Sequence, residues 1–223
     1  MKGDRLSILH EDEALLVVSK PAGSVVHWTR GAGDSPLLLE CLRRQCGCAL
    51  WPVHRLDRQA SGVIVFAKSA AVAAQLGADL RQQRWQKRYL VLCRGVLTEA
   101  LSVDHPVPEG EQRRPAQTAI APLEAFCRRY TLAAATPLSG RRHQLRYHFK
   151  HLRHPLVGDT LYGQGPINRF FRQTFGLHRL FLHAEALSLP HPLDGSALDL
   201  HCPLPDELGQ VLAALRQHLG PVA

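Results

Sequence analysis

Long uncharged hydrophobic runs are missing from this sequence of 223 residues, although 45% of its residues are hydrophobic. No stretch approaches the roughly 20 apolar residues that a membrane helix needs. The first twenty residues, MKGDRLSILHEDEALLVVSK, also lack an apolar core of signal-peptide length. The sequence therefore predicts a globular, cytoplasmic protein with no membrane partner.

Motifs for nucleotide and metal chemistry are also missing. Neither G-x-x-x-x-G-K-[ST] nor G-x-G-x-x-G occurs, which leaves nucleotide hydrolysis and dinucleotide binding without support. The carboxylates do not cluster as a two-metal nuclease requires. There is no C-x-x-C pair, so we expect reduced thiols. The six cysteines are Cys41, Cys46, Cys48, Cys93, Cys127 and Cys202.

Two histidine patterns only partly match metal sites. HAE at His183–Glu185 equals the first half of the zinc deaminase signature, but Cys202 has no partner cysteine three residues on. A second pattern consists of histidines at every third position, His148, His151 and His154. On a helix this spacing drifts around the axis, which favours a basic, RNA-facing or solvated surface over a metal site.

Basic residues are in excess. Lysine and arginine total 27 against 19 aspartates and glutamates, a formal net charge of +8. Clustered cations bind phosphates well, so a polyanionic partner such as nucleic acid is one interpretation. A protein that is merely basic is the other, and charge alone does not separate them.

Hydrophobic periodicity predicts an α+β fold with a central mixed, largely antiparallel sheet, because strands outnumber helices and do not alternate regularly with them. Strands are expected in the segment just before an acidic turn at residues 11–13, over residues 14–19, 62–68, 86–95, 117–126 and 128–137, and in a late hairpin over 186–192 and 196–203. Helices are expected over 35–45 and 69–84, with Ser35 and Ser69 as N-caps, and over 141–154 and 206–219. Residues 98–115 suggest a loop or short hairpin.

One carboxylate lies in an unusual place. PVHRLDRQASGVIVFAKS sets Asp57 close to two arginines and ahead of an apolar strand. Nearby guanidinium groups favour the ionised carboxylate, so Asp57 could be a nucleophile or base, or half of a surface ion pair. A tyrosine on the same strand face as a lysine could stack on a base, as Tyr89 and Lys87 would. Both the functional and the structural interpretation stay open on these residues alone.

Several motifs together resemble the RluA-type pseudouridine synthases. HRLDRQASG resembles the catalytic motif H-R-L-D-x-x-[ST]-S-G of that family. Further stretches also resemble family segments and occur in the family's order along the chain. They are VVSKPAGSVVH, which precedes the catalytic motif, and QKRYLVLCRG, LSGRRHQLRYHFKHLRHPLVGDTLYG and RLFLHAEALSLPHP, which come after it. The N-R-x-F insertion in GPINRFFRQTFGLHRLFLHA is most similar to the tRNA pseudouridine synthase C group. The similarity runs from about Leu6 to Pro192.

This resemblance implies an isomerase that converts a specific uridine in RNA to pseudouridine without cofactor or metal. It implies that Asp57 is the catalytic acid, by attack at C1′ or through a glycal. Arg146 matches the arginine that pairs with this aspartate, and Tyr89 matches the tyrosine that stacks on the target base. The expected fold is the pseudouridine synthase fold, as a single catalytic domain over residues 1–223 with no separate S4-like RNA-binding module.

The resemblance also implies that the nucleotide is flipped out of the RNA before reaction. Arg55 matches the arginine that fills the vacated space, and Leu182 matches a wall of the base pocket. The remaining candidates for contact with RNA are His54, Lys20, Lys87, Arg142, His143 and Gln144. Ala60 stands where the family usually has threonine. We expect this difference to reduce activity at most and not to abolish it.

The RNA is expected to be tRNA, with ribosomal RNA as the alternative. A second alternative is an RNA-binding or RNA-remodelling protein with vestigial catalytic residues. We expect a monomer with no obligate protein partner.

Overall fold

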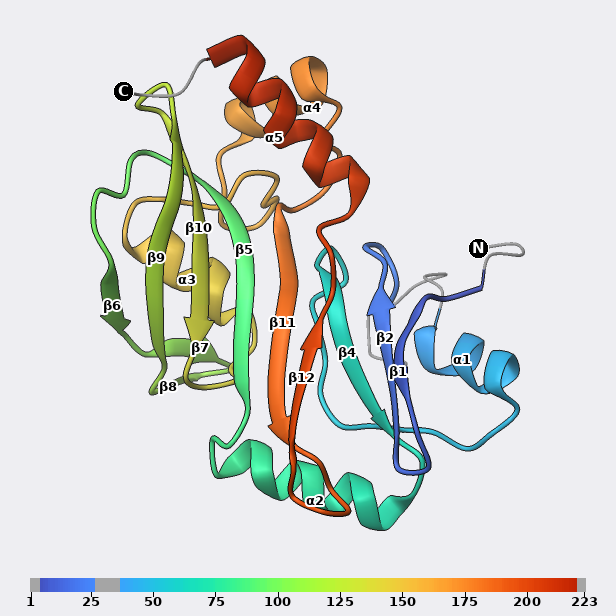
Figure 1. Cartoon of the computed structure of the whole chain (residues 1–223). Helices are drawn as coiled ribbons and strands as arrows, with labels where there is room; N and C mark the ends of the chain where they lie inside the picture. The colour runs from blue at the N-terminus through green and yellow to red at the C-terminus, as the bar shows by residue number, and fades with distance from the viewer. Residues whose placement is uncertain (1–4, 27–36, 220–223) are drawn as a thin grey trace. The chain divides into compact units, whose positions relative to one another are not determined.

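The computed structural model (Figure 1) describes residues 5–26 and 37–219, and the chain divides into two compact units. The first unit contains Met1–Gln86 and Ala184–Pro203, and the second contains Lys87–His183 and Leu204–Ala223. The expected single catalytic domain stays a prediction. Within the described ranges, no helix has both the length and the apolar character of a membrane span.

The first unit is built on antiparallel strand pairs. Strands β1 (Ile8–Glu11), β2 (Leu15–Lys20) and β4 (Ser61–Ala67) pair in that order, and β3 (Trp51–Pro52) also pairs with β4. Strand β11 (Leu182–Pro190) pairs with β12 (Ala197–His201), and an isolated parallel bridge joins Val25 and Leu37. The helices are α1 (Leu38–Cys46) and α2 (Ala70–Arg81).

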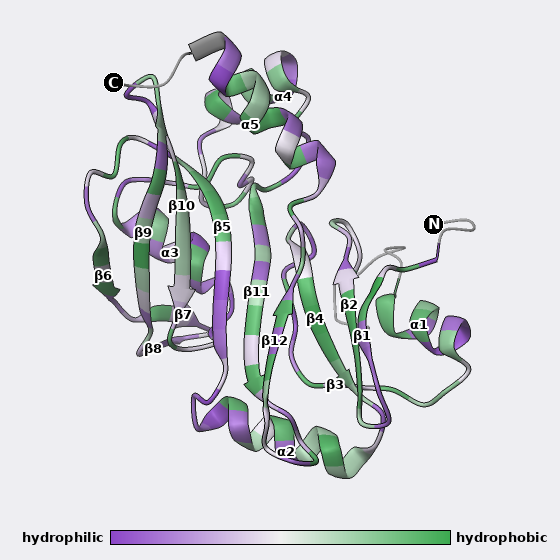
Figure 2. Ribbon diagram, in the orientation of Figure 1, coloured by the Kyte–Doolittle hydropathy of each residue, from purple (hydrophilic) through white to green (hydrophobic). Residues whose placement is uncertain are grey.

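Sequence signals explain these elements. All seven residues of β4 are buried, so the expected interior strand is confirmed, and Figure 2 shows it as hydrophobic along its length. The Ser69 side chain accepts from the Val72 N–H at 3.2 Å, which confirms the predicted cap of α2. Helix α1 begins at Leu38, after Leu37 at the cap position. The predicted cap Ser35 lies outside the described residues.

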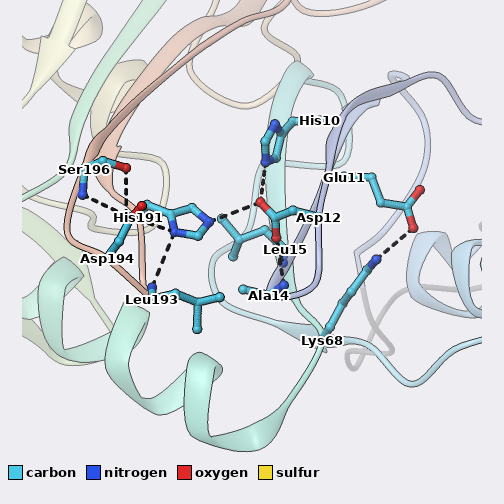
Figure 3. Close-up of polar contacts among 10 residues, drawn as sticks. All are labelled: His10, Glu11, Asp12, Ala14, Leu15, Lys68, His191, Leu193, Asp194 and Ser196. Atoms are coloured by element: carbon cyan, nitrogen blue, oxygen red, sulfur yellow. Dashed lines mark hydrogen bonds and ion pairs between the residues drawn. The ribbon is translucent and has the colours of Figure 1, made fainter.

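One carboxylate connects two turns of the first unit (Figure 3). Asp12, in the turn between β1 and β2, lies with Oδ2 2.5 Å from His10 Nε2 and 3.1 Å from His191 Nε2. Its Oδ1 accepts from the backbone N–H groups of Ala14 and Leu15 at 2.7 Å. Because His191 follows β11, this cluster joins the first hairpin to the last one.

The Asp12 cluster predicts a loss of stability in acid. Burial alone would raise the pKa of Asp12, but hydrogen bonds from His10, His191 and the backbone lower it to about 2. A depressed carboxyl pKa stabilises the fold above the ordinary value of 3.8 and ceases to do so as pH falls through about 2. The stability advantage of wild type over Asp12→Asn in urea unfolding should therefore shrink by about 1 kcal/mol between pH 5 and pH 2.5. A difference that is independent of pH would contradict this prediction.

The second unit contains a four-strand antiparallel arrangement. Strands β5 (Gln86–Arg94), β10 (Tyr130–Pro137), β9 (Gln117–Phe126) and β6 (Leu101–Asp104) pair in that order. Strands β7 (Val107–Glu109) and β8 (Gln112–Arg114) form a separate hairpin. The helices are α3 (Gln144–His151), α4 (Gly165–Phe175) and α5 (Asp206–Leu219). Helices α4 and α5 share one apolar core, in which Phe171 packs with Leu208, Val211 and Leu215.

The structure confirms the predicted α+β class and adds two elements to it. The segment 98–115 contains the hairpin β7–β8 but also β6, which was not predicted as a strand. Helix α4 was not predicted. Strand β9 does include Pro122, and the pairing with β10 shifts register between Leu132 and Ala133 beside it, as expected of a residue with no N–H to donate.

Candidate active site

Asp57 lies in the turn between β3 and β4 in the first unit. Its carbonyl accepts from the Ala60 N–H at 3.0 Å, which closes the turn. Leu56 and Ala60 are buried on either side, whereas Asp57 is half-buried and Arg55 is exposed. Two apolar anchors thus hold the loop while its charged side chains stay accessible.

Lys20 supports this loop from within. Its side chain is fully buried at the end of β2. The ammonium donates to the carbonyls of Ala60 at 2.8 Å, Pro21 at 3.1 Å and Arg58 at 3.3 Å. The Arg58 carbonyl also accepts from the Gly23 N–H at 2.7 Å. These contacts indicate a structural role for Lys20, and its burial disfavours the predicted contact with RNA.

The first and last residues of the motif HRLDRQASG, His54 and Gly62, are fixed by packing. His54 Nε2 accepts from the Val65 N–H at 3.0 Å, and its ring meets Trp85 edge to face. Gly62 has a φ of +123°, and a Cβ there would lie 2.2 Å from the carbonyl oxygen of Ala184. Only glycine fits such an approach, so this part of the motif is explained by the contact of β4 with the Ala184 backbone.

Tyr89 and Lys87 lie on β5 in the second unit. Both side chains are half-buried, and Tyr89 pairs with Ala135 of β10. They point to the same side of the strand because side chains alternate with a period of two. Burial lowers the pKa of Lys87. Figure 2 shows β5 changing from hydrophilic at its start to hydrophobic toward its end.

Gln144 ties the start of α3 to β9. Its Oε1 accepts from the Ser139 hydroxyl at 2.8 Å and from the Arg141 N–H at 3.1 Å. Its Nε2 donates to the Gln117 carbonyl at 2.9 Å and to Thr118 Oγ1 at 3.0 Å. The amide therefore has structural partners, and contact between Gln144 and RNA stays a prediction.

Helix α3 begins later than predicted, after His143 in a left-handed conformation with a φ of 54°. Arg142 before it is exposed, and His143 Nδ1 lies 3.3 Å from the Tyr162 hydroxyl. Arg146 differs from Arg142, because its side chain is only 10% exposed.

Arg146 makes a two-point ion pair inside the second unit. Its Nε donates to Asp159 Oδ2 at 2.7 Å, and its Nη2 donates to Oδ1 at 2.8 Å. Burial would raise the pKa of Asp159, but hydrogen bonds from Arg146 and from the Tyr162 N–H hold it below its ordinary value. The Tyr162 ring lies 5.2 Å from the Arg146 guanidinium carbon. Both ions are thus charged and enclosed.

The three regularly spaced histidines make different kinds of contact, and two of them contact the same residue, His105. His148 is buried, with Nε2 2.8 Å from the His105 carbonyl and Nδ1 2.9 Å from the Thr118 hydroxyl. His151 stacks on the His105 ring at 3.7 Å, and His154 Nδ1 lies 2.8 Å from a backbone carbonyl. Burial lowers the pKa of His148, so a neutral imidazole that both donates and accepts fits its site.

The candidate residues are distributed over both units. The first unit holds Lys20, His54, Arg55 and Asp57, and the second holds Lys87, Tyr89, Arg142, His143, Gln144, Arg146 and Leu182. Within the first, Lys20 at the end of β2 donates to carbonyls of the loop that contains Asp57. Within the second, His143, Gln144 and Arg146 share the first turn of α3. The pairing of Asp57 with Arg146 stays a prediction.

Two residues that contact Arg146 were assigned no role from the sequence. Asp159 and Tyr162 belong to the segment GDTLYG, which contributed to the resemblance without being assigned a role. Their spacing matched the family, but nothing in the sequence shows which distant cation the aspartate contacts.

Comparisons with known proteins show the family of the chain. The family model for RNA pseudouridylate synthase matches residues 14–151. A tRNA pseudouridine synthase C of Vibrio cholerae is 37% identical over 231 residues, covering 93% of this chain and 94% of that protein. A ribosomal large subunit pseudouridine synthase C of Pasteurella multocida is also 37% identical, covering 94% of this chain and 68% of that protein.

A solved structure supports the fold. Human RNA pseudouridylate synthase domain containing 4 superposes with a TM-score of 0.78 at 27% identity, covering 94% of this chain and 93% of that one. The pseudouridine synthase fold is therefore confirmed. This chain belongs to the RNA pseudouridylate synthase family, as an RluA-type isomerase that converts uridine in RNA to pseudouridine.

Proposed function

We propose that this chain isomerises a specific uridine of tRNA. The observation that supports this target is the 37% identity to the Vibrio cholerae tRNA pseudouridine synthase C, which extends over 93% of this chain and 94% of the relative. Similarity over nearly the whole of both chains includes the segments outside the shared motifs. We expect this enzyme to act in the cytoplasm. We also expect it to be a monomer with a single catalytic domain and no obligate protein partner.

Asp57 is proposed as the catalytic carboxylate. It occupies the aspartate position of HRLDRQASG, and its loop is held by Lys20 and by buried neighbours. The carboxylate either attacks C1′ or removes a ribose proton on the way to a glycal. Either route breaks the bond between N1 and C1′ and joins C5 of uracil to C1′. A glycosidase needs two carboxylates, but here the detached uracil stays bound and returns as the nucleophile, so one acid suffices.

Arg146 and Tyr89 are proposed to serve the same reaction. Arg146 keeps Asp57 ionised and oriented, because a guanidinium favours the charged carboxylate. Tyr89 stacks on the target base and places its hydroxyl for the late loss of a proton at C5. The half-buried position of Tyr89 on β5 suits a ring that must present one face to a base.

RNA binding is proposed to involve flipping of the target nucleotide, because the reacting atoms are not accessible within a stacked helix. Arg55, which is exposed beside the Asp57 loop, fills the space that the nucleotide leaves. Leu182, which is buried at the start of β11, borders the base. The exposed Arg142 and the half-buried Lys87 and His143 supply contacts to phosphate or ribose.

A second target deserves consideration because of a specific relative. The ribosomal large subunit enzyme of Pasteurella multocida shares 37% identity with 94% of this chain. This chain covers only 68% of that protein, whereas it covers 94% of the tRNA enzyme. Coverage of both full lengths favours tRNA over ribosomal RNA.

Pseudouridine mapping tests the target directly. Total RNA from cells with and without the gene would be mapped by carbodiimide-based sequencing. We expect one tRNA position to lose pseudouridine and to regain it with the wild-type gene but not with Asp57→Asn. Loss at a ribosomal position alone would overturn the tRNA assignment. No lost position, repeated with purified protein on total RNA, would overturn the proposed function.

A further inference from the structure

Arg146 is held by one edge of its guanidinium. The Nε and Nη2 donors both point at the two oxygens of Asp159, at 2.7 and 2.8 Å. Because a guanidinium is planar, two parallel hydrogen bonds fix both the plane of the group and its rotation. The edge that carries Nη1 is then directed away from Asp159. A single-point contact would leave that direction variable.

Asp159 is itself fixed by the turn that it begins. Its Oδ1 also accepts from the backbone N–H groups of Leu161 and Tyr162, both at 2.9 Å. Its own carbonyl accepts from Asn168 Nδ2 at 2.8 Å, while Asn168 Oδ1 accepts from the Gly158 N–H at 2.9 Å. Asn168 is the asparagine of the N-R-x-F insertion in α4. The carboxylate therefore has no freedom to turn without breaking several hydrogen bonds.

The surroundings leave little room for this turn to move. Gly158 has a φ of +79°, and a Cβ there would lie 2.0 Å from the Arg179 carbonyl oxygen. A Cβ on Gly163 would lie 2.2 Å from the Asp159 carbonyl oxygen. The side chain of Asp159 is 0% exposed. The turn from residue 158 to 163 is thus closely packed around one carboxylate.

We propose that Asp159 is a positioning residue for the reaction, and that it acts by holding the Arg146 guanidinium in a single orientation through the two-point ion pair. This inference rests on the proposed role of Arg146 beside the catalytic aspartate. The insertion that carries Asn168 contributes by fixing the Asp159 backbone. The arrangement supplies a cation whose direction is set before RNA binds, so no step of the reaction has to orient it.

The substitution Asp159→Asn tests this role. The amide keeps the shape of the carboxylate, but its NH₂ group faces an arginine donor and removes one of the two hydrogen bonds. We expect kcat for pseudouridine formation to fall about 10- to 100-fold with KM for RNA changed less than about 2-fold, because orientation affects the chemical step more than binding. The substrate is the RNA that mapping assigns to the wild type.

A matched control is available on the surface of the same unit. Glu124 makes a two-point ion pair with Arg216, with distances of 2.7 to 3.2 Å. Glu124→Gln should leave kcat and KM unchanged. An unchanged kcat in Asp159→Asn, or an equal loss in Glu124→Gln, would overturn the proposal.

A second set of variants separates positioning from general stability. Arg146→Lys cannot make the two-point pair, so it should lose activity on its own, and adding Asp159→Asn should cause no further loss. Losses that multiply would show that Asp159 does not act through Arg146. If Asp159→Asn does not fold, Asn168→Ala takes its place, with an expected fall in kcat of about 3- to 10-fold at unchanged KM.

A structural measurement is independent of the substrate. In ¹⁵N spectra the Arg146 Nε–H, identified by its absence in Arg146→Lys, should exchange slowly in wild type and at least about 10-fold faster in Asp159→Asn, because the hydrogen bond protects it. Unchanged exchange would overturn the proposal even if no RNA is modified. If the wild type modifies ribosomal RNA and Asp159→Asn shows the expected loss of kcat on that RNA, the tRNA assignment is overturned. The positioning role of Asp159 is then still supported.

Discussion

Asp57→Asn should reduce pseudouridine formation by at least about 10³-fold while leaving affinity for RNA nearly unchanged. The amide has almost the same size as the carboxylate, and the turn around residue 57 depends on backbone contacts that it keeps, such as the bond from Ala60 N–H to the Asp57 carbonyl. The charge that the reaction needs is lost. Single-turnover rates and equilibrium binding to the same RNA, measured side by side, separate the two effects.

A matched control for this substitution is Asp199→Asn, an exposed aspartate of β12. It should leave both rate and affinity at wild-type values. Residual activity of Asp57→Asn above about a tenth of wild type would assign the catalytic carboxylate elsewhere. A large loss of RNA affinity would instead mean that Asp57 contributes mainly to binding.

Lys20→Met should destabilise the protein by about 3 kcal/mol. Methionine has a similar length, but it leaves the carbonyls of Pro21, Arg58 and Ala60 without the ammonium that donates to them. An unsatisfied buried carbonyl costs roughly 1 to 3 kcal/mol, and the Arg58 carbonyl keeps a second donor in Gly23. Urea unfolding monitored by circular dichroism gives the change in free energy of unfolding.

Lys68→Met provides the comparison in the same unit. Lys68 pairs with Glu11 at 2.8 Å near the surface, and such pairs contribute less than about 1 kcal/mol. We expect Lys20→Met also to lose kcat at a temperature where it is fully folded, because the loop around Asp57 loses its support. A Lys20→Met protein as stable as Lys68→Met would contradict the structural role of Lys20.

Much of the fold could be predicted from local patterns. The apolar run in β4 and the Ser69 cap of α2 are signals carried by neighbouring residues, and both are confirmed. Helix α4 was not predicted, because its segment was interpreted only as a family insertion. Strand β6 was also missed, since its four residues are held by pairing with β9 more than by any pattern of their own.

The candidate site was less predictable than the fold. The motifs identified Arg146, but its partner Asp159 lies 13 residues away in a different turn, and sequence spacing does not show such contacts. Lys20 was interpreted as a candidate RNA contact because it lies in VVSKPAGSVVH, one of the stretches that resemble the family. Its burial depends on three carbonyls that converge only in the folded chain.

The burial of Lys20 and Arg146 also bears on how salt should affect RNA binding. RNA releases its bound counterions when cations of the protein neutralise its phosphates, and a cation already buried against protein oxygens neutralises no phosphate and releases none of them. The ammonium of Lys20 donates to backbone carbonyls and the guanidinium of Arg146 to Asp159. The affinity for RNA should therefore fall less steeply with ionic strength than the 27 lysines and arginines of the sequence suggest.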